Sequence, residues 1–220
     1  MTHQDSHHPI SQPEHWNRVA PTVTFSHPLE TAWLDRWVGR SGRILDFGCG
    51  YGRTLNELHG HGYACLVGVD AASAMIERGR ASFPRLDLRH IDGLPLAEPD
   101  GAFDAILLLA VLTCIADDAS QRALAQELRR LLKPRGVLFL SDMPLQSDAR
   151  HADRYVRGAA EFGRFGVFRA SDGAVVRHHD EGWLDQLFGD FDRLEERRIA
   201  VRTMNGNPAV ATQRLLRRAT

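Results

Sequence analysis

Three glycines at alternating positions follow a short apolar segment near residue 45. Ile44-Leu45-Asp46-Phe47 leads into Gly48-Cys49-Gly50-Tyr51-Gly52, and a helical pattern begins directly afterwards. Glycine permits positive φ angles and lets a ligand reach contact distance of the backbone. The N-terminus of the helix that follows offers free N–H groups and a dipole that favour a carboxylate or phosphate. This loop by itself indicates a site for a nucleotide-like ligand.

A carboxylate narrows the choice of ligand. Asp70 comes eighteen residues after Gly52, at the end of the next predicted strand, where it can accept hydrogen bonds from both hydroxyls of a ribose. The dinucleotide fingerprint GxGxxG needs glycine at position 53, and this chain has Arg53. The observed pattern is DxGxGxG, which disfavours NAD but leaves an NAD-dependent oxidoreductase as an alternative.

Short apolar segments and helical patterns alternate around these residues, which predicts a doubly wound α/β fold with helices on both faces of a mostly parallel sheet. A helix from 27 to 39 precedes the first strand. Ligands of such sheets bind beyond the carboxyl ends of the strands. Asp46, Asp70, Asp92, Thr113 and Asp142 follow successive predicted strands and should share that edge. The predicted strands are 43–47, 65–69, 86–90, 103–109 and 137–140, and the predicted helices between them are 51–59, 73–81 and 119–132.

The alternation ends after Asp142. Residues 143–182 are rich in arginine, glycine and aromatic residues and are expected to form a small lid insertion after strand five, with a hairpin of 165–169 and 175–178. A helix at 181–188 and two strands at 192–202 and 209–218 follow. Residues 1–15 are polar and are expected to be a disordered tail, which leaves 16–220 as a single domain.

The composition is that of an ordinary globular protein. The 220 residues are 43% hydrophobic and 25% charged, with a formal net charge of -1. That charge provides no global positive field for nucleic acid, and no segment predicts a signal peptide or a membrane span. Three cysteines without a CxxC pair favour neither a disulfide framework nor a metal site, so we expect a cytoplasmic protein without bound metal.

Four segments together resemble the class I, Rossmann-like, S-adenosylmethionine-dependent methyltransferases. The likeness covers roughly residues 41–142. Its elements are Ile44 to Gly52, Val67-Gly68-Val69-Asp70 with Ser73 to Ile76 behind it, Asp92-Gly93, and Leu131 to Leu138 with the turn Lys133-Pro134-Arg135-Gly136. The resemblance implies a seven-stranded sheet whose last strand is antiparallel, in agreement with the two strands predicted at the end of the chain.

The resemblance also implies roles for individual residues toward S-adenosyl-L-methionine. The glycine loop would wrap its methionine part, with Asp46 near the ammonium group. Asp70 would hold the ribose, and Asp92 would accept a hydrogen bond from the adenine amino group. Ala110 would lie near the transferred methyl. The full set of expected cofactor-binding residues is Asp46, Gly48, Cys49, Gly50, Gly52, Asp70, Ala71, Met75, Asp92, Gly93 and Ala110.

The acceptor is expected to be a small molecule, because neither an [Asn/Asp]-Pro-Pro-aromatic motif after residue 109 nor an RNA-binding module is present. An RNA or protein methyltransferase and a non-catalytic cofactor-binding protein remain the alternatives. A hydroxyl acceptor profits from a base, whereas an unprotonated amine needs none. The candidate bases or binding residues are His178, His179, Tyr155 and His27, with His151 as a further histidine and Arg150, Arg154 and Arg164 as possible anion clamps.

Overall fold

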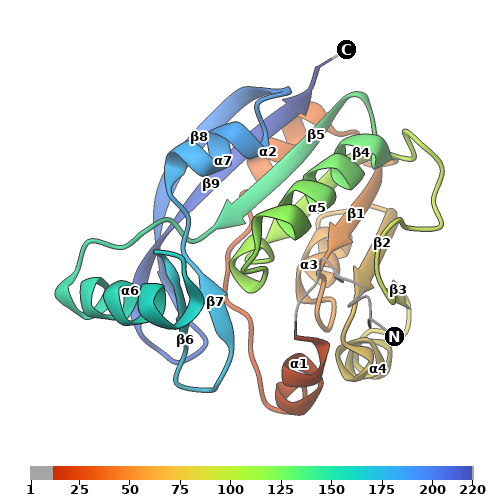
Figure 1. The fold of residues 1–220 in the computed structure, drawn as a ribbon. Coiled ribbons are helices and arrows are strands. Elements are labelled where there is room, and N and C mark those ends of the chain that lie inside the picture. Colours follow the sequence, from red (N-terminus) through yellow and green to blue (C-terminus); the bar gives the residue numbers. More distant parts are fainter. Residues whose placement is uncertain (1–11, 220) are drawn as a thin grey trace, which may run out of the picture.

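The computed structural model describes residues 12–219 and is built around one seven-stranded sheet. Its strands are β1 (Arg43–Phe47), β2 (Cys65–Asp70), β3 (Asp87–His90), β4 (Phe103–Leu109), β5 (Leu132–Asp142), β8 (Phe191–Arg202) and β9 (Pro208–Arg218). They lie in the order β3-β2-β1-β4-β5-β9-β8 (Figure 1). The first five strands pair in parallel, and β9 is antiparallel to both of its neighbours. The predicted fold class and the antiparallel last strand are confirmed.

Helices cover both faces because the central strands are apolar on both sides. Ile44 and Leu45 are neighbours on β1, point to opposite faces and are both fully buried. Leu45 packs with α5 (Asp118–Leu131) and α7 (Glu181–Leu187), and Ile44 packs with α2 (Thr31–Trp37) and α3 (Arg53–Gly60). Continuous burial on both faces is what parallel strands with crossover helices require.

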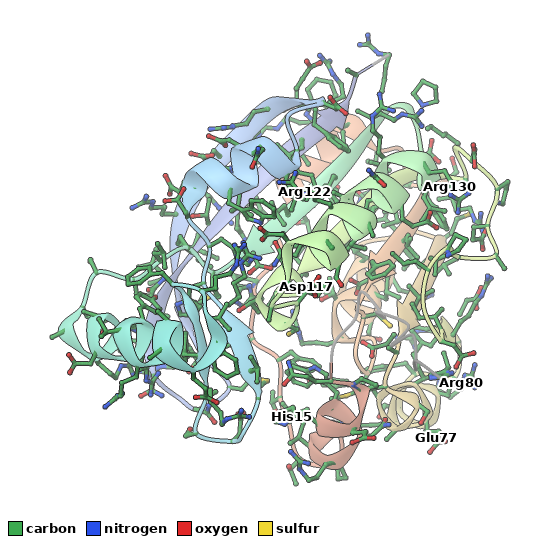
Figure 2. The ribbon with its side chains drawn as sticks, in the orientation of Figure 1. His15, Glu77, Arg80, Asp117, Arg122 and Arg130 are labelled. Atoms are coloured by element: carbon green, nitrogen blue, oxygen red, sulfur yellow. The ribbon has the colours of Figure 1, made fainter. Side chains whose placement is uncertain are left out.

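Side-chain caps determine where several helices begin. Asp117 precedes α5, and its carboxylate accepts a hydrogen bond from Ser120 N at 2.7 Å (Figure 2). Arg130 lies in the last turn of α5, where a cation interacts favourably with the helix dipole. Such caps satisfy N–H groups that have no partner within the helix. The predicted helix at 119–132 therefore agrees with the observed one to within a residue at each end.

The segment after β5 forms the expected insertion and contains one helix that was not predicted. The hairpin is confirmed as β6 (Val167–Arg169) paired with β7 (Val175–Arg177). Before it, α6 (Ala149–Phe162) packs on β6 and projects from one side of the sheet (Figure 1). We call α6, β6, β7 and their connections, residues 143–180, the lid. The residues that α6 buries are His151, Tyr155 and Gly158, of which only Tyr155 is a large aromatic or aliphatic side chain, so the sequence lacked the usual aliphatic signal of a helix.

Three boundaries differ from expectation, and one of them is α2, which spans Thr31–Trp37 where a helix from 27 to 39 was expected. The helix α1 (Pro13–Val19) begins three residues before the expected start of ordered structure at Trp16, and His15 within it is buried. Proline is favoured in the first helical turn, and α1 packs on α4 (Ser73–Ser82). The rest of the predicted tail, residues 1–11, lies outside the described residues. The strand β5 begins at Leu132 rather than Val137, with a pairing irregularity across the Lys133 to Gly136 turn.

Candidate functional site

The glycine loop connects β1 to α3 in a conformation that only small residues tolerate. Gly48 and Gly50 have φ angles of 74° and 53°. A Cβ atom on Gly50 would lie 2.4 Å from the ring of Phe25, so a side chain there requires Phe25 to move. The N–H groups of Gly48 and Cys49 both donate to the carbonyl of Val69, which fastens the loop to the end of β2.

Asp70 is tied into the same loop. Its two carboxylate oxygens accept hydrogen bonds from the N–H groups of Gly50 and Ala72, each at 2.8 Å. Burial raises its pKa, and those backbone donors act in the opposite direction. A carboxylate has about four lone-pair positions, so two remain for ribose hydroxyls. Asp70 thus shapes the loop in addition to facing the cavity.

Asp46 provides a direct test of whether the site suits an ammonium group. The side chain is 2% exposed, and its Oδ2 atom is buried without a hydrogen-bond partner among the described residues. Burial raises the pKa of this carboxyl to about 7, while the nearby Arg53 acts to lower it. A buried polar atom without a partner is costly unless a ligand satisfies it. The amino group of a bound amino-acid moiety fits this position.

The rest of the expected cofactor set divides between two cavities. Met75, Cys49 and Ala110 line the main cavity, and Ala110 follows β4 with a φ angle of 55°. Asp92 and Gly93 instead line a second cavity beside the end of β3, and the Asp92 side chain is 98% exposed. Gly52 and Ala71 line neither. Gly52 is the N-cap residue of α3 in the left-handed conformation.

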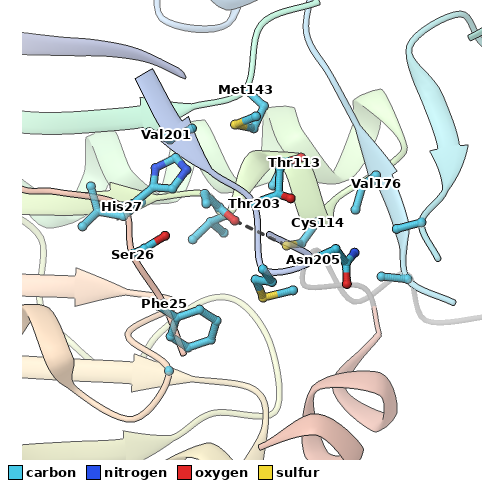
Figure 3. A pocket seen from close by; sticks show the side chains of 18 of the residues that line it. Phe25, Ser26, His27, Thr113, Cys114, Met143, Val176, Val201, Thr203 and Asn205 are labelled. Atoms are coloured by element: carbon cyan, nitrogen blue, oxygen red, sulfur yellow. Dashed lines mark hydrogen bonds between the residues drawn. The ribbon is translucent and has the colours of Figure 1, made fainter. Parts of the chain in front are cut away.

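Beyond Ala110 the main cavity continues beneath the lid. Phe25, Ser26 and His27 form one side in the close-up view, and Val176 of the lid lies on the other (Figure 3). The turn between β8 and β9 contributes Thr203 and Asn205. Other residues of this chamber are Met143, Arg150, His151, Arg154, Phe168, His178, Val201, Met204 and Asn207.

Two of the four expected acceptor-side residues line this chamber. His27 and His178 do, and burial lowers the pKa of these two imidazoles to about 4 and about 3. Tyr155 is buried behind His178, with its hydroxyl 2.7 Å from His178 Nδ1. His179 points away from the cavity, where its Nε2 atom lies 2.9 Å from Gln121 Nε2. One member of the His178-His179 pair therefore faces the cavity, as expected, and the other is part of the core.

Sequence patterns did not reveal several residues that shape the chamber. Asp148 was not among the candidates, although it is the N-cap of α6 and its Oδ2 atom lies 2.5 Å from His151 Nδ1. The spacing Asp-x-x-His at a helix start is the signal that marks it. Arg53 is a second such residue. In the sequence it only disfavours the dinucleotide fingerprint, but in the structure its guanidinium donates a hydrogen bond to the carbonyl of His27. That bond ties the N-terminal segment to the glycine loop.

Metal-ligating side chains do not gather in the described part of the chain. Among residues 12–219, no group of three or more His, Cys, Asp or Glu side chains is arranged to hold a metal ion. The three cysteines form no disulfide, and burial raises the pKa of the Cys49 thiol well above its usual value. None of the helices in this part of the chain combines the length and apolar character of a membrane span.

Comparisons with known proteins agree with the geometry. Residues 44–136 match the family model of a methyltransferase domain. The chain is 30% identical over 164 residues to the ribosomal protein L11 methyltransferase of Burkholderia vietnamiensis, covering 73% of this chain and 48% of that protein. It is 32% identical over 159 residues to a tRNA N(3)-cytidine methyltransferase of Mus musculus, covering 66% and 39%. The chain therefore spans half or less of these relatives.

A solved structure matches nearly the whole fold. A SAM-dependent methyltransferase from Methanosarcina mazei superposes with a TM-score of 0.81 at 21% identity, over 89% of this chain and 99% of the other. At that identity the likeness concerns the fold, and the family model covers the segment that holds Asp46, the glycine loop and Asp70. Residues 44–136 therefore belong to the methyltransferase domain family, and the chain as a whole has the fold of the class I S-adenosylmethionine-dependent methyltransferases.

Proposed function

We propose that this chain transfers a methyl group from S-adenosylmethionine to a small-molecule acceptor. The observation that carries the proposal is the continuity of the main cavity. It runs from Asp46 and the glycine loop past Ala110 into a chamber that the lid and the β8–β9 turn enclose. A cofactor site that opens into a separate, mainly apolar chamber is what a two-substrate reaction needs.

Different residues of the chain are proposed to bind different parts of the cofactor. Asp46 offers its partnerless oxygen to the ammonium group, and Asp70 offers its remaining lone pairs to the ribose. Asp92 and Gly93 are proposed to hold the adenine at the second cavity. When bound, S-adenosylmethionine supplies a methyl group activated by a positively charged sulfur. The protein's remaining task is to hold the acceptor in line with that methyl group.

The lid supports a small acceptor over a macromolecular one. The chamber lies behind α6 and the β6-β7 hairpin, and its wall includes Phe168, Val176 and Val201. Burial of such an acceptor excludes water from the reaction. The chamber also argues against a non-catalytic cofactor-binding role, which needs no space beyond the methyl group. The similar proteins named above act on a ribosomal protein and a tRNA, so these two acceptor classes form the alternatives in the test.

The test uses S-adenosylmethionine labelled in its methyl group. We expect S-adenosylhomocysteine, but not NADH, to bind the purified chain in calorimetry. Cell extract is then separated by size, and label is expected in the low-mass fraction after incubation with the enzyme. Label found only in protein or RNA would reassign the acceptor, and stabilisation by NADH alone would overturn the methyltransferase assignment. The absence of disulfides favours a reducing compartment, and we propose the cytoplasm.

A further inference from the structure

Three histidines line the main cavity, and their hydrogen bonds give them different chemistry. They are His27 before α2, His151 in the first turn of α6, and His178 directly after β7. A neutral imidazole carries its proton on one nitrogen and a lone pair on the other. Which nitrogen faces the cavity as a base follows from what the opposite nitrogen contacts.

His178 presents a donor to the cavity. The hydroxyl oxygen of Tyr155 accepts a hydrogen bond from Gln146 N at 2.9 Å, which directs the hydroxyl proton to His178 Nδ1 at 2.7 Å. Because Nδ1 accepts that proton, the imidazole proton of neutral His178 lies on Nε2. Its pKa, lowered to about 3 by burial, keeps it neutral at physiological pH.

His27 presents a donor for the same reason. Its Nδ1 atom lies 3.1 Å from the hydroxyl oxygen of Ser141, and Gln213 Nε2 approaches that oxygen at 3.4 Å. Ser141 accepts from Gln213, and we assign its own proton to the hydrogen bond with His27 Nδ1. The Nε2 atom of His27 therefore also carries a proton.

His151 is the exception. Its Nδ1 atom lies 2.5 Å from Asp148 Oδ2, and an ionised carboxylate can only accept, so the imidazole proton lies on Nδ1. The hydrogen bond to His151 holds the pKa of Asp148 below its usual value. The other oxygen of Asp148 accepts from the His151 N–H at 3.2 Å, so one carboxylate fixes both ring and backbone. Nε2 of this 2%-exposed side chain therefore carries the lone pair.

A cation lies beside this base. Arg154 is one helical turn after His151 and also lines the cavity. Within residues 12–219 its guanidinium makes no ion pair or hydrogen bond, and its one aromatic contact is with Phe168, 5.5 Å from the ring centre. The guanidinium of an arginine provides a fork that matches a carboxylate or phosphate.

Building on the proposed methyl transfer, we infer that the acceptor is an anionic hydroxy compound, with its acidic group on Arg154 and its hydroxyl on His151. The hydroxyl proton passes to Nε2 of His151 while the oxygen attacks the methyl carbon. A C–O bond forms, the sulfur–carbon bond breaks, and the sulfur keeps the electron pair. The products are a methyl ether, S-adenosylhomocysteine and a proton that the imidazole releases to solvent. His27 and His178 act as hydrogen-bond donors to the acceptor, and Asp148 is a positioning residue.

The first experiment does not depend on activity. In protein labelled with 15N-histidine, two-bond correlation spectra distinguish the two neutral tautomers. We expect the Nδ1–H form for His151 and the Nε2–H form for His27 and His178, with H151Q, H27Q and H178Q used for assignment. Asp148→Asn should remove the Nδ1–H preference of His151. An Nε2–H signal for His151 in the unmodified protein would overturn its role as the base.

The second experiment tests the acceptor class with three probes of similar shape. These are 3-hydroxybenzoate, 3-aminobenzoate and 3-hydroxybenzyl alcohol, each added with S-adenosylmethionine and followed by mass spectrometry. We expect O-methylation of the hydroxy acid only, and a fall in kcat of roughly 100-fold to 10,000-fold in His151→Gln with KM little changed. The matched control is His59→Gln, since His59 is exposed at the end of α3.

Two arginine variants of α6 test whether Arg154 binds the acidic group of the acceptor. Arg154→Gln should raise KM for 3-hydroxybenzoate more than tenfold, whereas Arg157→Gln, on the exposed side of α6, should not.

The outcomes separate the inference from the proposed function. Methylation of the amine or the neutral alcohol in preference to the acid, or equal KM values for Arg154→Gln and the wild type, overturns the acceptor class and leaves methyl transfer intact. No binding of the hydroxy acid in the presence of S-adenosylhomocysteine overturns it as well. Failure of S-adenosylhomocysteine itself to bind overturns the proposed function instead.

Discussion

The cofactor half and the acceptor half of the cavity are built by different means. The cofactor half comes from one stretch of chain, from Asp46 at the end of β1 to Met75 in α4, and backbone geometry determines most of it. The acceptor half is assembled from side chains of the N-terminal segment, the lid and the β8–β9 turn. One half can therefore bind the same cofactor in many proteins while the other varies with the acceptor.

The two halves also differ in how their polar groups are satisfied. In the cofactor half, two backbone N–H groups hold Asp70, and one oxygen of Asp46 has no partner within residues 12–219. In the acceptor half, His151 and His178 are each held by a side chain, Asp148 and Tyr155. Affinity for S-adenosylhomocysteine should therefore respond strongly to changes in the first half and weakly to changes in the second.

The largest expected effect is that of Gly50→Ala. The new Cβ atom would overlap the Phe25 ring at 2.4 Å and would require a φ angle of 53° in a residue that is not glycine. Overpacking and strain of this kind cost about 3 kcal/mol, so we expect the affinity for S-adenosylhomocysteine to fall about 100-fold in calorimetry.

Gly62→Ala is the matched control for Gly50→Ala. Gly62 also has a positive φ angle, of 87°, but no atom lies within 4 Å of an added Cβ. It should lose about 1 kcal/mol of stability in urea unfolding and keep its cofactor affinity. Equal affinities for Gly50→Ala and the wild type would show that the loop does not contact the cofactor.

Asp70→Ala is expected to have the next largest effect on cofactor affinity. It removes charge-assisted hydrogen bonds worth about 1.5 to 3 kcal/mol, which is roughly 10-fold to 150-fold in Kd. Because Asp70 also holds the N–H groups of Gly50 and Ala72, we expect a lower free energy of unfolding as well. Calorimetry and urea unfolding of the same variant separate these effects. Unchanged affinity would refute the ribose assignment.

Asp46→Asn should change the pH dependence of binding. With a pKa of about 7 in the free protein, the Asp46 carboxyl must lose its proton before it can pair with an ammonium group. Wild-type affinity should rise by up to about tenfold per pH unit below pH 7 and level off above it. The variant should show a flat profile in calorimetry. A flat wild-type profile would contradict the ammonium contact.

The same raised pKa affects the stability of the free protein. Folding raises the pKa of Asp46 and of Asp142 from the ordinary 3.8 to about 7, so each favours the folded state at low pH. That stabilisation is complete below about pH 4 and is lost as the pH rises through 7. In urea unfolding at several pH values, Asp46→Asn should reduce the change in the free energy of unfolding with pH. The change that remains should come from Asp142.

The smallest effect on cofactor affinity is expected from Phe168→Ala. Phe168 is 5% exposed and packs against His151, Tyr155 and His178, so its removal should lower stability by about 3 to 5 kcal/mol. The affinity for S-adenosylhomocysteine, measured at a temperature where the variant is folded, should stay within about twofold of the wild type. A large loss would mean that the two halves are coupled.

Sequence alone predicted the strands, loop and helix that form the cofactor half, because these elements follow one another in the chain. The order of strand, glycine loop, helix and strand-end carboxylate lies within residues 43–82, and glycine spacing reports directly on backbone conformation. The alternation of short apolar segments and helices likewise predicted the parallel sheet. The terminal hairpin strands at 191–202 and 208–218 were predicted to within one residue.

Tertiary structure alone decided the acceptor half. The sequence offered several histidines of equal standing, but it contained no signal that His179 turns into the core toward Gln121 while His178 turns into the cavity. Side-chain direction at neighbouring positions of an irregular segment depends on packing against distant elements. The proton positions on His27, His151 and His178 depend on Ser141, Asp148 and Tyr155, and two of these three contacts join residues more than twenty positions apart. Local patterns carry no record of such contacts.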